Sequence, residues 1–232
     1  MNSRKLNGII TYAPLSKEEI INYSNTNKKI FIAINSEKIM QSNERTKTLI
    51  NKNFGYPDGI GVVWALRRKG CNNVIKIPGC ELWLDIIKSN YKSKSFYLIG
   101  GKEIVINKTV SQLENEFPGI NILNHHHGYI NNDNQINDII DDVVKRKPDF
   151  VFVAVGSPKQ EIIMDKMFQA YKTSYFGLGG SFDIYTGNKS RAPDWWLENN
   201  LEWGYRLLNE PKRIMRQIVI LPFIIKLILN RL

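Results

Sequence analysis

The chain has 232 residues, of which 43% are hydrophobic and 23% are charged. This composition excludes a disordered chain, and the length suffices for one large domain or two small ones. The formal net charge of +10 predicts an anionic partner, such as nucleic acid, an anionic membrane surface or a phosphorylated substrate.

The cysteines and the first residues both indicate an intracellular protein. Cys71 and Cys80 form no CxxC pattern and have no histidine at metal-ligand spacing, which favours reduced structural thiols. Three consecutive histidines, residues 125–127, cannot all face one ion from a strand, so we expect no metal site there. No apolar segment followed by a cleavage site is visible near Met1. We therefore expect a cytoplasmic location.

Short β-branched and aromatic runs alternate with longer helical patterns along most of the chain. The predicted strands are residues 8–13, 29–35, 95–100, 120–123, 149–155 and 173–179. The helical patterns between and after them are residues 16–24, 36–50, 101–117, 132–147 and 157–171. This alternation is typical of βαβ units. We predict an α/β fold with a mainly parallel, Rossmann-like sheet flanked by helices.

The pattern changes after Ala192, where strand signals stop. The remainder is typical of two helices, interrupted at Pro211 and kinked at Pro222. We therefore divide the chain into an α/β core, residues 1–194, and a C-terminal helical appendage, residues 195–232. Half of the net positive charge lies between Gly204 and Leu232, where six basic residues face one acidic residue.

Residues 218–229 are almost entirely non-polar, with Lys226 as the exception. A membrane-spanning helix needs about 20 apolar residues, so this stretch is too short to cross a bilayer. With basic residues around it, it favours a helix lying in the plane of an anionic membrane surface. A contact between copies of the chain in a homo-oligomer is the alternative.

Three glycine-containing loops follow predicted strands, at residues 100–102, 156–160 and 179–183. In a parallel sheet such loops meet at one edge, where helix N-termini offer free N–H groups to a ligand. Neither GxGxxG nor GxxxxGK[ST] occurs, so dinucleotide-binding and P-loop signatures are absent. On local pattern alone, each loop could also be a tight strand-to-helix turn.

Asp58 and Asn35 are candidate polar groups at the same edge. Asp58 stands between Pro57 and Gly59, before a helical pattern at residues 62–70. It could be a general base toward a hydroxyl or merely a helix N-cap. Asn35 ends a predicted strand and could face the same cleft or serve as a turn or cap residue.

Several segments together carry a resemblance that covers nearly the whole chain. They are residues 57–65 (PDGIGVVWA), 77–79 (IPG), 127–129 (HGY), 156–161 (GSPKQE), 179–183 (GGSFD), 191–193 (RAP), 201–207 (LEWGYRL) and 210–213 (EPKR). In this order they resemble glycosyltransferase family 26, the bacterial WecG/TagA/CpsF transferases of teichoic acid, common antigen and capsule synthesis.

The resemblance implies an inverting, metal-independent sugar transfer. The donor would be a UDP-sugar, often UDP-N-acetylmannosamine or its uronate. The acceptor would be a sugar on undecaprenyl diphosphate at the cytoplasmic face of the cell membrane, which makes the protein a peripheral membrane enzyme. No cofactor is expected.

The resemblance also implies roles for individual residues. Asp58 matches the proposed catalytic base, Gln160 an active-site polar residue, and Tyr129 and Asp183 positions near the uridine. Asn35 matches a substrate-binding position, although Ala33 replaces a threonine found in many members. Lys76 stands where an arginine is frequent and lacks the planar fork of that side chain. These two departures leave the sugar specificity open.

Three arginines of the appendage, Arg206, Arg213 and Arg216, are seven and three residues apart. The family resemblance implies that one or more of them closes over the active site and neutralises the departing diphosphate. A solvated basic face or contacts with lipid headgroups would explain the same spacing. Pro211 between them leaves open whether they share one helix face.

Two other functions compete with the enzyme. A nucleic-acid-binding protein would fit the positive charge, but Trp195, Trp196 and Trp203 have a spacing that favours packing of the appendage on the body. A non-catalytic accessory subunit of a partner glycosyltransferase would fit the departures at Ala33 and Lys76. The presence of Asp58 and Gln160 favours the enzyme.

Overall fold

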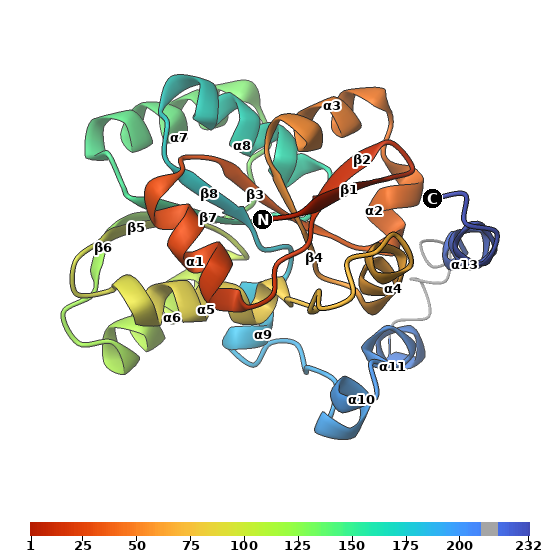
Figure 1. The fold of residues 1–232 in the computed structure, drawn as a ribbon. Coiled ribbons are helices and arrows are strands. Elements are labelled where there is room, and N and C mark those ends of the chain that lie inside the picture. The colour runs from red at the N-terminus through yellow and green to blue at the C-terminus, as the bar shows by residue number, and fades with distance from the viewer. Residues whose placement is uncertain (210–217) are drawn as a thin grey trace.

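The computed structural model describes residues 1–209 and 218–232, which form a parallel β-sheet between two layers of helices (Figure 1). The sheet has six strands in the order β4-β3-β8-β7-β5-β6, and every neighbouring pair is parallel. The strands are β3 (Ile30–Ile34), β4 (Phe54–Pro57), β5 (Ser95–Gly100), β6 (Asn121–His126), β7 (Phe150–Ala154) and β8 (Ser174–Gly177). The predicted α/β fold class is confirmed.

The four inner strands of the sheet, β3, β8, β7 and β5, are buried on both faces because they are apolar at nearly every position. On β7, Val151 and Val153 belong to one hydrophobic core, whereas Phe150 and Phe152 belong to the other. Successive side chains of a strand point to opposite faces, so a continuous apolar run supplies both cores.

Helices cover each of the two cores (Figure 1). One core is packed against α2 (Ser36–Gln41), α3 (Glu44–Lys52), α4 (Ile60–Arg68), α7 (Asp133–Arg146) and α8 (Lys159–Ala170). The other is packed against α1 (Lys17–Thr26), α5 (Gly79–Asn90), α6 (Glu103–Glu116) and α9 (Ser181–Tyr185).

The N-terminal region differs from the prediction. The predicted strand at residues 8–13 is β2 (Ile9–Tyr12), which pairs with β1 (Ser3–Leu6) in a separate antiparallel hairpin. Asn7 and Gly8 both have positive φ, 45° and 88°, and an Asn-Gly pair is the preferred turn for a two-residue hairpin. The short-range turn signal therefore decides the pairing of this strand.

Strand β4 was not predicted from the sequence. It is only four residues long and ends in Pro57. Proline cannot donate to a central ladder, but β4 is an edge strand that pairs with β3 alone in the six-stranded sheet, where a missing N–H is tolerated.

The predicted helix at residues 36–50 is two helices, α2 and α3. Asn43 separates them, because its side chain accepts a hydrogen bond from Thr46 N at 2.9 Å and so caps the start of α3. Helix α5, which was not predicted, begins after Pro78. Both boundaries lie at residues that favour a helix start rather than at breaks in hydrophobic periodicity.

The C-terminal region contains α10 (Asp194–Glu198), α11 (Glu202–Asn209) and α13 (Ile220–Ile228). Pro222 lies in the first turn of α13, where proline needs no N–H bond partner, so the predicted kink is not formed there. The predicted interruption at Pro211 lies outside the described residues.

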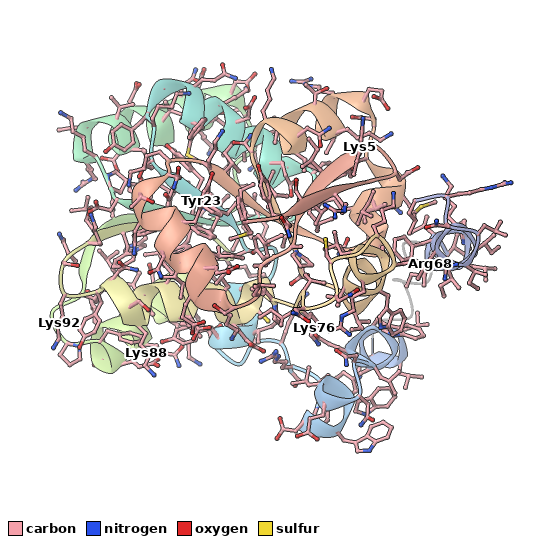
Figure 2. All side chains as sticks on the ribbon, viewed as in Figure 1. Lys5, Tyr23, Arg68, Lys76, Lys88 and Lys92 are labelled. Atoms are coloured by element: carbon pink, nitrogen blue, oxygen red, sulfur yellow. The ribbon has the colours of Figure 1, made fainter. Side chains whose placement is uncertain are left out.

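Helix α13 is docked on the body beside α2 and α4 (Figure 1). Phe223 is 1% exposed and packs into the core against Gly61, where an added Cβ would lie 3.0 Å from the phenyl ring. Arg68 of α4 donates to the Ile228 carbonyl at 2.9 Å (Figure 2). Lys226 donates to Asn7 Oδ1 at 3.0 Å. One face of α13 is therefore fixed to the core.

Asp149 joins the beginnings of β5 and β7. Its Oδ2 accepts hydrogen bonds from Ser95 N at 2.9 Å and Ser95 Oγ at 2.8 Å, and its Oδ1 pairs with Lys94 at 3.2 Å. Partial burial by itself raises the pKa of this carboxyl, but the bonds from Ser95 and Lys94 outweigh it and lower the pKa below its ordinary value. The ionised carboxylate is the form that the fold stabilises.

We predict that Asp149→Asn lowers the free energy of unfolding by about 1–2 kcal/mol near neutral pH, because a charged acceptor is lost. The folded-state pKa lies below the unfolded value, so the contribution is complete above the unfolded pKa and disappears as the pH falls through the folded one. Urea denaturation from about pH 7 to about pH 3 should show wild type and variant converging. A difference that stays constant with pH would contradict this role.

Candidate active site

Two adjoining cavities lie at the carboxyl edge of the sheet, where the loops after β3, β7 and β8 meet. The larger, of about 840 Å³, is lined by the glycine loops at 101–102, 156–159 and 179–180. The smaller, of about 220 Å³, contains Asp58 and Gln160. All three glycine loops singled out from the sequence therefore contribute to the larger cavity, as expected for ligand-binding loops of a parallel sheet.

The two cavities share part of their lining. The residues common to both are Asn35, Lys38, Ser157, Gly179, Gly180 and Lys189. An extended ligand can therefore occupy both cavities, with its middle at this junction.

Asp58 directly follows β4, and its N–H donates to the Ile34 carbonyl at 3.0 Å. Its Oδ1 accepts a hydrogen bond from Gly79 N, at the start of α5, at 2.8 Å. The alternative that Asp58 caps α4 is wrong, because the N-cap is Gly59 and no side-chain cap bond is present there. The carboxylate is instead held at the N-terminus of α5, where the helix dipole favours negative charge.

Tyr56 lies behind this carboxylate and was not identified from the sequence. Its hydroxyl is buried and has no hydrogen-bond partner among the described residues. Burial, as the larger cause, and the nearby charge of Asp58, as the smaller one, raise the pKa of the Tyr56 hydroxyl well above its ordinary value. The phenol therefore stays neutral beside the candidate base.

Gln160 is buried and joins two of the loops. Its Oε1 accepts from Gly179 N at 2.9 Å, and its Nε2 donates to Glu161 Oε1 at 3.3 Å. A Cβ at Gly177 would lie 2.7 Å from Nε2, so glycine at this position makes room for the amide. Among the described residues, Gln160 therefore links the loop after β8 to the start of α8, in the lining of the smaller cavity.

Lys38 and Glu161 form a buried ion pair under the junction of the cavities. The distance from Nζ to Oε1 is 2.5 Å, and the two side chains are 10% and 2% exposed. Burial by itself raises the pKa of the Glu161 carboxyl, but Lys38 and the Ser157 hydroxyl outweigh it and hold that pKa below its usual value. Sequence reasoning missed this pair because its members are 123 positions apart.

The remaining candidate residues from the sequence occupy different places. Asn35 caps α2 by accepting from Lys38 N at 2.8 Å, and it also lines both cavities. Tyr129, which is 55% exposed, and Asp183 line the larger cavity. Lys76 lines neither of these two cavities and donates to Asn200 Oδ1 at 2.9 Å, between the body and α11 (Figure 2).

The side chains of the three candidate arginines in the appendage are not described by the structure. Arg206 lies on α11, but its side chain is not among the described parts of the chain. Arg213 and Arg216 lie outside the described residues.

The segment that brings Lys189 to the junction is anchored by charged side chains. Arg191 pairs with Glu81 of α5, and Lys17 of α1 contacts the same carboxylate at 2.8 Å. Burial by itself raises the pKa of Glu81, but these two cations outweigh it and lower the pKa below its ordinary value. The Arg191–Glu81 pair thereby attaches residues 189–191 to α5, and Lys17 binds the same carboxylate from α1.

Within residues 1–209 and 218–232, no three or more histidine, cysteine, aspartate or glutamate side chains form a group that could hold a metal ion. Cys71 and Cys80 do not form a disulfide bond. The polar groups that line the two cavities include amides, hydroxyls, lysines, the Cys80 thiol and the carboxylates of Glu37, Asp58, Glu161 and Asp183.

Two comparisons with known proteins address the family of the chain. A sequence profile described as "Glycosyl transferase WecG/TagA/CpsF family" matches residues 9–232. A similar protein from Bacillus spizizenii, named N-acetylglucosaminyldiphosphoundecaprenol N-acetyl-beta-D-mannosaminyltransferase, is 34% identical over 204 residues, covering 85% of this chain and 78% of that protein. The resemblance seen in the sequence is thereby confirmed. The chain belongs to the WecG/TagA/CpsF family and is a glycosyltransferase.

Proposed function

We propose that the protein transfers N-acetylmannosamine, or a related hexose, from a UDP-sugar to a sugar carried on undecaprenyl diphosphate, with inversion at the anomeric carbon. The observation that carries this proposal is the placement of the Asp58 carboxylate in the smaller cavity, next to a larger cavity with room for a nucleotide. The name of the Bacillus spizizenii relative supports the acceptor and the sugar. The product would enter a bacterial cell-surface polysaccharide such as teichoic acid, capsule or common antigen.

In the proposed reaction, Asp58 acts as general base. Its carboxylate takes the proton of the acceptor hydroxyl as that oxygen forms a bond to the anomeric carbon. The bond from the anomeric carbon to the diphosphate oxygen breaks, and UDP leaves with the electron pair. The Gly79 N–H at 2.8 Å orients Asp58 Oδ1 for this step.

The larger cavity is the proposed site of the nucleotide. Tyr129 at its mouth offers a face for stacking of the uracil, and Asp183 offers hydrogen-bond acceptors to the uridine. Asn35 and Gln160, which line the smaller cavity, are the proposed contacts to the sugar. Lys76 is a further proposed substrate-binding residue. We also propose that one or more of Arg206, Arg213 and Arg216 bind the departing diphosphate when the appendage closes over the site.

We also propose that α13 attaches the protein to the inner leaflet of the cell membrane. No helix within residues 1–209 and 218–232 is long and apolar enough to cross a bilayer. While Phe223 faces the core, Leu221, Ile225 and Ile228 of α13 are 66%, 49% and 63% exposed. An apolar helix face with adjacent basic residues favours a position in the plane of the membrane, close to a lipid-linked acceptor.

We expect Asp58→Asn to lower transfer by two or more orders of magnitude, because the amide cannot accept the proton. The measurement is transfer by the purified chain from a panel of UDP-sugars to lipid-diphosphate-linked N-acetylglucosamine. Asp138→Asn on the exposed side of α7 is the control and should keep wild-type activity. Full activity of Asp58→Asn would assign the base elsewhere, and no transfer by wild type with any donor would favour the accessory-subunit alternative.

Transfer is expected to continue in excess EDTA, because cationic side chains and backbone N–H groups at the junction supply the charge that the leaving diphosphate needs. The same assay, run with and without the chelator, measures this. Activity that EDTA abolishes and Mg²⁺ restores would refute metal independence while leaving the transfer itself established.

We expect the triple variant Leu221→Gln, Ile225→Gln and Ile228→Gln to lose at least about tenfold in binding to vesicles containing phosphatidylglycerol, because the apolar area available for insertion is removed. Vesicle flotation is the measurement. Ile104→Gln on α6, whose side chain is 74% exposed, is the matched control and should bind as wild type does. Unchanged flotation together with a loss of self-association would favour the oligomer contact.

A further inference from the structure

Lys38 and Lys189 are the two basic residues that line both cavities of the described site. They differ in how they are held. Lys189 is exposed, whereas the Lys38 side chain is only 10% exposed where it lines the two cavities. A buried ammonium at this place needs a physical explanation, because burying a charge costs free energy.

The backbone of Lys38 is fixed from the sheet. Asn35, at the end of β3, caps α2 by accepting from Lys38 N at 2.8 Å. This capping bond starts α2 directly at the carboxyl edge of β3 and places Lys38 in its first turn. The side chain therefore rises from a rigid element rather than from a mobile loop.

The ammonium group is fixed from the opposite side of the junction by Glu161. Oε1 of this residue accepts from Lys38 Nζ at 2.5 Å and from Ser157 Oγ at 2.8 Å. Its Oε2 is buried and has no hydrogen-bond partner in the described part of the chain. The carboxylate thus directs its bonds toward Lys38 and the β7 loop, although its second oxygen is left unsatisfied.

Such a pair does little for stability. A buried ion pair is frequently no more stable than apolar residues of the same volume, because desolvation offsets the attraction. An ammonium has three N–H donors, and one bond from Lys38 Nζ is found among the described residues, to Glu161. Two donors therefore remain at the point where the two cavities join.

We propose that Lys38 binds the diphosphate of the nucleotide sugar, with Glu161 as the positioning residue that holds its ammonium at the junction. This inference rests on the proposed function, in which the uridine lies in the larger cavity and the sugar in the smaller. The diphosphate then spans the junction. As the bond from the anomeric carbon to the diphosphate oxygen breaks, the negative charge that develops on UDP lies beside a cation that is already in place.

The experiment is calorimetric binding of UDP, UMP and uridine to the full chain. Lys38→Met should weaken UDP binding by about 10- to 100-fold, the range for loss of a charge-assisted hydrogen bond. Uridine binding should stay within about twofold of wild type, because the nucleoside does not reach the junction. Lys166→Met is the matched control: it removes a lysine that pairs with Asp133 on the surface, outside both cavities, and should leave both affinities unchanged.

A second variant addresses folding. Lys38→Met leaves the Glu161 carboxylate buried without its cation, which is strongly destabilising. The double variant Lys38→Met with Glu161→Gln leaves a neutral pair and should fold. It should bind UDP no more weakly than Lys38→Met, because Glu161 acts through Lys38 and the two effects are not additive. Glu161→Gln alone should weaken UDP and spare uridine.

The outcomes separate the inference from the proposed function. If wild type binds UDP and the folded double variant binds it equally well, the inference is wrong and the donor class stands. If UDP and uridine binding fall together, Lys38 shapes the cavity rather than meeting the diphosphate, and the inference is again wrong. If wild type binds neither UDP nor uridine, the proposed donor class fails, and the inference that rests on it fails as well.

Discussion

The constraint on which this structure depends is a parallel sheet buried on both faces. Because the four inner strands, β3, β5, β7 and β8, supply apolar side chains to both cores, polar groups are largely excluded from the two faces of the sheet and collect where the strands end. All six strands point the same way, so these ends lie at one edge. The two cavities, the glycine loops and Asp58 are found there as a consequence of topology, and a sheet with mixed strand directions would have divided them between two edges.

At that edge, hydrogen bonds and an ion pair between separate elements hold the loops in place, as strand pairing does within the sheet. Asp58 is bonded to the N-terminus of α5, Gln160 joins the loops after β7 and β8, and the Lys38–Glu161 pair joins α2 to α8. Each bond crosses between elements that are distant in the chain. The proposed reaction requires a base, a sugar and a diphosphate to be aligned, and such fixed geometry would favour it, since orientation is a large part of what a transferase contributes to rate. The same arrangement leaves Glu161 Oε2 and the Tyr56 hydroxyl buried without a hydrogen-bond partner among the described residues, which lowers the stability of the fold.

Helix α13 connects this site to the expected location of the substrate. Phe223 anchors one face of the helix against Gly61 of α4, and α4 begins two residues after Asp58. The opposite face is apolar and exposed. A lipid-linked acceptor would therefore approach from the side of the molecule on which the base is held, and a membrane contact at α13 would orient the cavities toward that acceptor.

The sequence by itself determined the fold class, the family and the loops that form the cavities, because these depend on local periodicity, on glycine placement and on motifs of a few adjacent residues. It identified Asp58 but left base and helix cap as alternatives, since a cap is distinguished only by the bond its side chain makes. Strand β4 was not predicted because its four residues show no alternation of apolar and polar side chains. The hairpin of β1 and β2 was not predicted because the prediction places Gly8 in a strand rather than in the Asn7-Gly8 turn. Only the tertiary structure decided that Lys38 meets Glu161 across 123 positions and that Gln160 binds Gly179. Pairing between distant residues is set by how helices pack on the sheet, and no local pattern encodes it.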